Sequence, residues 1–548
     1  MDFLNEQNFS IKHIGHLGLV ADKIDELNLI ELIDQRLPIS ATHGAKVSHG
    51  ERVAAMIFNG LGFIDSRLYL FPEFLEDKAI DRLFNRELDV NYFNDDALGR
   101  CLDSISDYGA TKLFTEIAFL IGQKKKLLGK SVHIDTTTLS LYGEYETDEI
   151  NGDTPHPKQG YAKSGRHDLK QMVLLLATTG AASFPIWMES HSGNASDQKT
   201  MPQAATKIKA LCDELKSSPD FIYVGDSAIY ANILQHSDEM FWITRVPERI
   251  KEARILASIE KENGVWHDLQ NGYAYSTHDS NYGDVKQRWI LFFSEAAFMR
   301  ECKTLDKNVQ KESIEQEKLW WHLSNQIFEC EKDCAAEMKK LLKKLKYHHV
   351  SAEIIPVKKH AGLGRPKKDT EAEIVGYQIT YQLSVDQKKY ESEKNKKGRF
   401  ILSTNQLDNN LLPCDEVLKE YKAQSGTERG FKFIKNDTFQ VDSVFLKTPA
   451  RIEALMMVMT LCLMIYGVSE YDLRQALVEK NATVRTQTKK QTQNPSLLWI
   501  YFLFRVVNEV HVCFENQTKK IVANINRELK SIVGYFGKRA QVIYLNSA

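Results

Sequence analysis

The apolar positions of the chain follow two patterns, and the change between them falls near residue 130. Before it, apolar residues recur at helical spacing, which predicts helices at 17–37, from the capping box Ser48-His-Gly-Glu51 onward, at 96–105 and at 111–128. After it, short runs rich in β-branched and aliphatic residues predict strands at 131–139, 171–177 and 184–189. The sequence therefore predicts an N-terminal all-α domain at 1–128, followed by a domain that begins with a sheet.

Helices and strands alternate after the third strand. The pattern predicts a helix from Asp197, a strand at 221–226, a helix at 228–235 and a strand at 241–246. This is the element order of an RNase H-like mixed sheet with flanking helices. Asp135 lies on the first strand and Asp226 closes the fourth. If those strands are parallel neighbours, the two aspartates meet at one edge of the sheet, and two like charges there need a cation.

A segment of about 150 residues then interrupts the sheet. It alternates like strands at 265–297 and continues as a long charged helix at 307–347, whose charges are typical of a solvated face. Between residues 356 and 399, eleven Lys and Arg residues stand against six Asp and Glu residues, a net charge of +5. Because Arg365, Lys367 and Lys368 form a basic run there, they are candidates for contacts with a DNA backbone.

A further helix is predicted from Leu412 onward, because Pro413 and Asp415 suit a first helical turn. Four polar residues follow at offsets 0, 3, 7 and 14 and are expected to share one helical face: Tyr421, Gln424, Glu428 and Lys435. Gly426 and Gly430 flank Glu428, although each weakens a helix by roughly 1 kcal/mol relative to alanine. These glycines predict that a neighbouring element packs closely against the helix beside Glu428.

Length and composition describe a multidomain globular protein. The 548 residues are too many for one core, and a formal net charge of −2 means that any nucleic-acid surface must be local. The eight cysteines are scattered, and no basic region followed by an apolar core opens the chain, so we expect reduced thiols and a cytoplasmic location. The apolar run 454–468 has 15 residues, fewer than the roughly 20 of a membrane span. It predicts a buried core helix and no membrane partner.

The residues around the three carboxylates resemble bacterial insertion-sequence transposases of the DDE, RNase H-like superfamily. The resemblance is to the branch that has a β-rich insertion and the signature Tyr-x2-Arg-x3-Glu-x6-Lys. The chain matches this signature at Tyr421, Glu428 and Lys435 and carries Gln424 in place of the arginine. The first two carboxylates of the family correspond to Asp135 in His-Ile-Asp-Thr-Thr and to Asp226 in Tyr-Val-Gly-Asp-Ser.

The resemblance implies a metal-dependent enzyme that cleaves transposon DNA ends and transfers them into target DNA. Asp135, Asp226 and Glu428 would be catalytic and would hold two Mg²⁺ ions, with Mn²⁺ as a substitute, while Tyr421, Gln424 and Lys435 would face DNA. The partners would be double-stranded DNA and a second copy of the chain, in a homodimer associated with the nucleoid. The implied domains are an RNase H-like core at 131–248 and 398–468 and an insertion at 249–397. A C-terminal helical region at 469–548 is expected from its position in the chain alone.

Two other functions remain open on the sequence alone. An RNase H-like nuclease that lacks strand transfer needs the same three carboxylates. A DNA-binding protein derived from a transposase does not need them, and all three are present. The N-terminal domain is assigned either to binding of DNA ends or to dimerisation.

Overall fold

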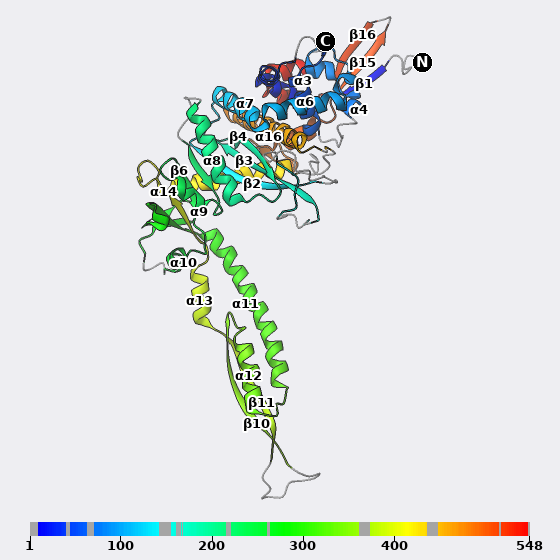
Figure 1. The fold of residues 1–548 in the computed structure, drawn as a ribbon. Coiled ribbons are helices and arrows are strands. Elements are labelled where there is room, and N and C mark those ends of the chain that lie inside the picture. Colours follow the sequence, from blue (N-terminus) through cyan, green and yellow to red (C-terminus); the bar gives the residue numbers. More distant parts are fainter. Residues whose placement is uncertain are drawn as a thin grey trace. The chain divides into compact units, whose positions relative to one another are not determined.

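The computed structural model describes residues 9–39, 44–62, 71–141, 155–160, 166, 168–214, 221–259, 264–360, 373–435, 446, 448–514 and 517–545. The fold is mixed α/β (Figure 1). It divides into two compact units, which we call the first unit (1–244 with 416–548) and the second unit (245–415). Each unit is described by itself.

The N-terminal part of the first unit is mainly helical. Its helices are α1 (Leu17–Glu26), α2 (Leu29–Asp34), α3 (His49–Leu61), α4 (Phe71–Glu76), α5 (Ile80–Phe84), α6 (Asp95–Tyr108) and α7 (Ala110–Lys125). Of these, α4 and α5 were not predicted from the sequence. The capping box is confirmed: Glu51 N donates to Ser48 Oγ at 3.1 Å, and Ser48 N donates to Glu51 Oε2 at 2.8 Å. The predicted helix 17–37 is two helices, because Asn28 between them takes a left-handed φ of 52°.

The first unit contains a five-stranded part of a mixed sheet. Its strands are β2 (Ser131–Leu141), β3 (Lys170–Thr179), β4 (Phe184–Ser192), β5 (Ile222–Gly225) and β6 (Phe241–Arg245). They lie in the order β4-β3-β2-β5-β6. The pairs β4/β3 and β3/β2 are antiparallel, whereas β2/β5 and β5/β6 are parallel. The predicted strands are confirmed within a few residues, and α8 (Asp197–Glu214) and α9 (Tyr230–Ile233) connect the later ones.

The apolar run 454–468 forms the middle of α16 (Pro449–Glu479), and 78% of the helix's most apolar window is buried. The helix is long and apolar enough to cross a membrane, but its burial confirms the predicted core helix. Polar contacts fix it at both ends: Arg451 binds Asp103 of α6 through two bonds of 2.7 Å, and Asp472 accepts from the buried Lys23 of α1 at 2.6 Å. All eight cysteines are free thiols.

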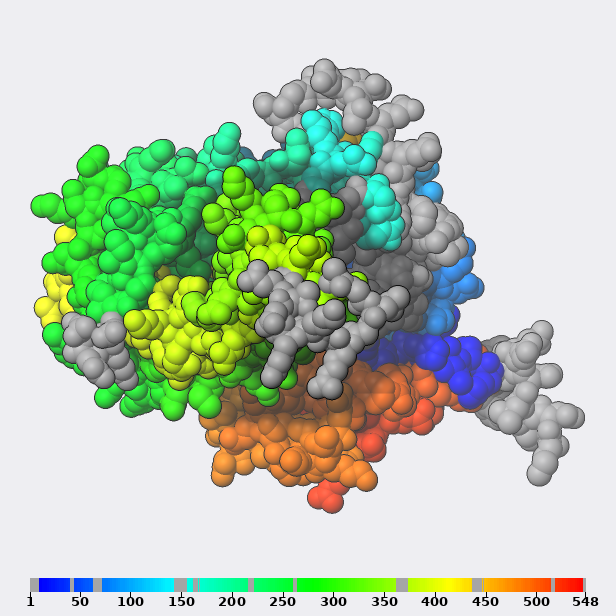
Figure 2. Space-filling model, turned by 90° about the horizontal axis from the view of Figure 1, so that it is seen from below, coloured from blue at the N-terminus to red at the C-terminus, as the bar shows by residue number. Residues whose placement is uncertain are grey.

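The two ends of the described chain share a small sheet, which the sequence analysis did not predict. Strand β1 (Phe9–His13) pairs with β15 (Asn508–Phe514), which pairs with β16 (Gln517–Ala523). Figures 1 and 2 show the blue N-terminal strand against these orange-red strands. The N-terminal region is therefore not purely helical. The C-terminal region also departs from the all-helical expectation, since strands β13 to β16 accompany helices α17 (Leu497–Phe504), α18 (Arg527–Val533) and α19 (Lys538–Leu545).

The second unit combines strands with a long charged helix. It contains α10 (Lys251–Ser258), β7 (His267–Leu269), β8 (Tyr273–Ser280), β9 (Gln287–Ser294), α11 (Glu295–Ser324), α12 (Glu331–Leu342), β10 (His348–Lys359), β11 (Glu373–Val385), α13 (Gln387–Asn395) and β12 (Arg399–Thr404). Strand β12 pairs antiparallel with β9. The hairpin β10–β11 packs on α11 and α12 around Trp320 and Ile379 (Figure 1).

Candidate active site

Asp135 and Asp226 lie on or directly after two neighbouring parallel strands. In the pairing of β2 with β5, His133 is opposite Val224. Asp135 comes two residues after His133, and Asp226 comes two residues after Val224. Asp135 therefore lies on β2 two residues beyond this pair, and Asp226 directly follows the end of β5, on neighbouring strands roughly 4.8 Å apart. Both residues are half-buried. Asp135 Oδ1 accepts from Thr136 N, and Asp226 Oδ1 accepts from Ala228 N, each at 2.8 Å.

Helix α15 (Ser425–Ile434), which carries Glu428, covers the face of the sheet that carries Asp135. On β3, Thr178 is opposite His133 and Leu176 is opposite Asp135, so these side chains share that face. Thr178 Oγ1 lies 2.6 Å from Thr427 Oγ1 of α15 in a buried hydrogen bond. A Cβ on Gly430 would lie 3.5 Å from Leu176 Cδ2. Between Thr427 and Gly430, α15 therefore passes from the level of His133 to the level of Asp135.

The predicted helix from Leu412 is two helices, α14 (Cys414–Ala423) and α15, separated at Gln424. Gln424 is only 8% exposed, whereas Glu428 and Lys435 are exposed and Tyr421 is half-buried. The four residues therefore differ in their exposure to solvent, and their contact with DNA stays a prediction.

The glycines beside Glu428 are there for close packing, as the sequence predicted. A Cβ on Gly426 would lie 2.0 Å from Ser183 Oγ, in the turn between β3 and β4. A Cβ on Gly430 would lie 3.0 Å from Leu463 Cδ2 of α16. Side chains at these two positions would hold α15 further from the sheet, so the glycines let Glu428 approach the strand that carries Asp135.

Glu428 lies in the first turn of α15, directly after Thr427, and its side chain is exposed. Among the residues that the structure describes, no three His, Cys, Asp or Glu side chains are grouped closely enough to hold a metal ion. The carboxylate oxygens of Asp135, Asp226 and Glu428 are nevertheless the hard donors that Mg²⁺ prefers. Their assignment as metal ligands stays a prediction.

Ser131, His133 and Glu420 form a buried polar cluster at the start of β2, which was not predicted from the sequence. Ser131 Oγ donates to Glu420 Oε2 of α14 and lies 3.1 Å from His133 Nε2, which is 3.8 Å from the same carboxylate. Burial lowers the pKa of His133 to about 4, so its imidazole is neutral at pH 7. Only the alternation of Ser131, His133 and Asp135 along one strand could have indicated that these side chains share a face.

The basic run Arg365, Lys367 and Lys368 lies outside the described residues. Tyr421 and Lys435 lie near the ends of α14 and α15, and their contacts with DNA remain predictions. Within the described residues, Asp135 lies on β2, Asp226 follows the parallel neighbour β5, and α15 packs against β2 and β3.

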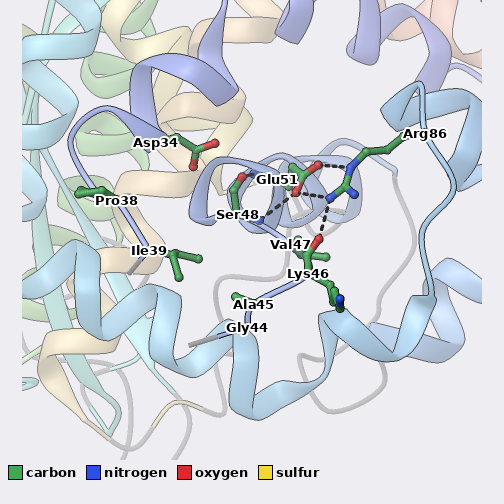
Figure 3. Close-up of a pocket in the computed structure, with 10 residues that line it drawn as sticks. All are labelled: Asp34, Pro38, Ile39, Gly44, Ala45, Lys46, Val47, Ser48, Glu51 and Arg86. Carbon is green, nitrogen blue, oxygen red and sulfur yellow. Dashed lines mark hydrogen bonds and ion pairs between the residues drawn. The ribbon is translucent and has the colours of Figure 1, made fainter. Parts of the chain in front are cut away.

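A pocket of about 390 Å³ lies at the start of α3 (Figure 3). Its charged groups are largely paired with one another: Arg86 binds Glu51 through bonds of 2.7 and 2.8 Å and donates to Lys46 O at 2.8 Å. Asp34 accepts from Gly50 N at 2.7 Å. These contacts anchor the N-terminus of α3, and none of the carboxylates discussed above lines this pocket.

Comparison with known proteins adds one sequence match. Residues 9–119 match the model of a domain of unknown function, DUF4277. This match covers α1 to α6, β1 and most of α7, and it ends before the first strand that carries a site residue. A search of curated proteins finds no match.

A comparison with solved structures finds a piggyBac transposase, in a synaptic complex with hairpin DNA. It aligns over 89% of this chain and 79% of that chain, with a TM-score of 0.35 and 10% sequence identity.

Proposed function

We propose that the protein is a DDE transposase, which cleaves transposon DNA ends with the help of metal ions and transfers them into target DNA. The observation that carries the proposal is that Asp135 lies on β2 and Asp226 directly follows β5, its parallel neighbour, while α15, which bears Glu428, packs against β2 and β3. The signature residues Tyr421, Glu428 and Lys435 all belong to this helical segment or end it.

The strand order supports an RNase H-like core. Three antiparallel strands, β4-β3-β2, continue into the parallel strands β5 and β6, with helices between the later strands. The second unit follows β6 in the sequence and precedes α15, the position of the β-rich insertion in the transposase branch that the sequence resembles. An insertion at this position leaves the two aspartates on the sheet and brings Glu428 back from a distant part of the chain.

Each side chain of the proposed site would have its own role. Asp135 and Asp226 would hold Mg²⁺, because two adjacent carboxylates repel each other unless a cation lies between them. Bound metal supplies a Lewis acid that activates water and stabilises the leaving 3′-oxygen of a phosphodiester. Glu428 is exposed, so its carboxylate is free to turn toward the two aspartates and complete the ligand set. Lys435 would place a positive charge beside a DNA phosphate, and Tyr421 would donate its hydroxyl to another phosphate.

The test uses the purified protein and the DNA that flanks its own gene, with and without Mg²⁺ or Mn²⁺. We expect metal-dependent cleavage at the element's ends. Asp135→Asn, Asp226→Asn and Glu428→Gln should each abolish cleavage and leave DNA binding intact. Asp238→Asn is the matched control, because Asp238 is exposed and lies outside this face. Near wild-type cleavage by one of the three variants would remove that residue from the site.

Strand transfer separates the transposase from a nuclease with the same carboxylates. Cleaved ends are mixed with a supercoiled target plasmid, and joined products are sequenced across the junction. A transposase gives ends joined through their 3′-hydroxyls to target DNA. Cleavage without any joined product would favour the nuclease. Because an enzyme of this kind handles two ends, we also propose that the protein acts as a homodimer on DNA.

A further inference from the structure

We propose that Glu420 is a positioning residue, which fixes α14 on the start of β2 and thereby sets where Glu428 stands relative to Asp135 and Asp226. The proposal rests on the proposed function, because it concerns how the third carboxylate reaches the other two. Three observations carry it: a buried hydrogen bond, a match in spacing between helix and strand, and a short link between the two helices.

The buried contact joins Glu420 to the strand that carries Asp135. Ser131 and His133 are 3% and 4% exposed, and the Glu420 side chain is 19% exposed. The Ser131 hydroxyl donates to Glu420, which leaves its oxygen to accept from His133 Nε2. The other ion pair of α14 that meets this strand region, Glu416 with Lys130, is 3.5 Å long, and the Lys130 side chain is 81% exposed. It therefore contributes little, and Glu420 is the main anchor.

The contacts of α14 and α15 with the sheet show that this pair of helices runs alongside β2. Glu420 contacts Ser131, Thr427 contacts the residue opposite His133, and Gly430 meets the residue opposite Asp135. From Glu420 to Gly430 a helix rises about 15 Å, at about 1.5 Å per residue. From Ser131 to Asp135 a strand rises about 13 Å, at about 3.3 Å per residue. Because these lengths agree, fixing Glu420 at Ser131 brings the Glu428 turn to the level of Asp135.

The link between the helices is short. Gln424 alone separates α14 from α15, with helical φ and ψ of −53° and −28° and an exposure of 8%. Thr427 N donates to Gln424 O at 3.0 Å, and Gln424 N donates to Tyr421 O at 3.3 Å. A shift of α14 would therefore be passed to the first turn of α15, where Glu428 lies.

The experiment compares Glu420→Ala, which removes the acceptor, with Glu420→Gln, which keeps an oxygen for Ser131. Glu420→Ala should lower the rate of Mg²⁺-dependent cleavage about 10- to 100-fold, since small misplacements of a reacting group cost that much. It should also raise the Mg²⁺ concentration for half-maximal cleavage about 10-fold, as loss of a group that orients a ligand does. Affinity for the DNA end should stay within about twofold. Glu420→Gln should restore both values, and Glu416→Gln on the same helix should change neither.

A second measurement does not depend on activity. Hydrogen exchange of the α15 amides should be faster in Glu420→Ala than in wild type and unchanged in Glu420→Gln. Unchanged exchange in α15, or an unchanged Mg²⁺ dependence of a cleaving Glu420→Ala variant, would overturn the positioning role. If wild type shows no cleavage at all, the proposed function fails, and the exchange of α15 still decides whether Glu420 positions it.

Discussion

The close approach of α15 to the turn between β3 and β4 gives a sharp test of the site's construction. Gly426→Ala would place its Cβ 2.0 Å from Ser183 Oγ and 2.7 Å from Ser183 Cβ. Neither atom is the end of a long flexible side chain, so the backbone must move. Gly430→Ala on the same helix would meet Leu463 Cδ2 at 3.0 Å and Leu176 Cδ2 at 3.5 Å, and leucine side chains can adjust. The two substitutions make the same chemical change in different surroundings.

Alanine in a helix gains about 1 kcal/mol over glycine. Overpacking of a close contact costs roughly 1 to 3 kcal/mol. We therefore expect Gly426→Ala to lower the free energy of unfolding by about 1 kcal/mol and Gly430→Ala to leave it unchanged or raise it slightly. Urea unfolding of each variant measures the difference. Gly426→Ala should also slow cleavage, because α15 is displaced along with Glu428.

A compensating substitution makes this prediction stricter. Ser183→Gly removes both atoms that the new Cβ would meet, and glycine suits the left-handed φ of 49° at this position. The double variant Gly426→Ala with Ser183→Gly should therefore recover the stability and the cleavage rate that Gly426→Ala loses. If Gly426→Ala is as stable as Gly430→Ala, or if Ser183→Gly rescues nothing, the account of why glycine stands beside Glu428 is refuted.

Three further predictions concern charge. Burial raises the pKa of Glu509, but hydrogen bonds from His511 and Arg82 outweigh this effect and leave the pKa lowered. Glu509→Gln should therefore destabilise the protein by about 1 to 3 kcal/mol at pH values above the pKa of the unfolded state. In acid unfolding curves this difference should vanish as the pH falls through the lowered pKa. Replacing Arg365, Lys367 and Lys368 with alanine should flatten the plot of log K against log salt by about 0.9 per lost contact, and an unchanged slope would exclude them from the interface. Gln424→Arg should lower the melting temperature and not tighten DNA binding, because it buries an unpaired charge at a position that is 8% exposed; tighter binding at unchanged stability would contradict this.

The sequence predicted the features that depend on neighbours along the chain. The Ser48 capping box, strand β2 and the apolar run in α16 are all recognised from residues within a short stretch of the chain. The parallel pairing of β2 with β5, the strand that precedes Asp226, was also expected. Local patterns were enough for these features.

The remaining features depend on contacts between distant residues. The helix break at Gln424 has no breaker residue at that position, and it fits the requirement that Thr427 and Gly430 both meet the sheet. The hydrogen bond between Ser131 and Glu420 joins residues 289 positions apart, so it could not be predicted from spacing in the sequence. The exposure of Glu428 likewise depends on how α15 lies on β2 and β3.

The pairing of β1 with β15 has a consequence for how the protein is made. His13 bonds to Asn508, which is synthesised 495 residues later. At about 5 to 20 residues per second, β1 waits on the ribosome for roughly 25 to 100 s before its partner strand exists. During that time its edge, with the outward-facing Phe9 and Ile11, is open to other chains. A fragment that ends at residue 119 would keep this edge open permanently, so we expect it to aggregate unless β15 and β16 are supplied.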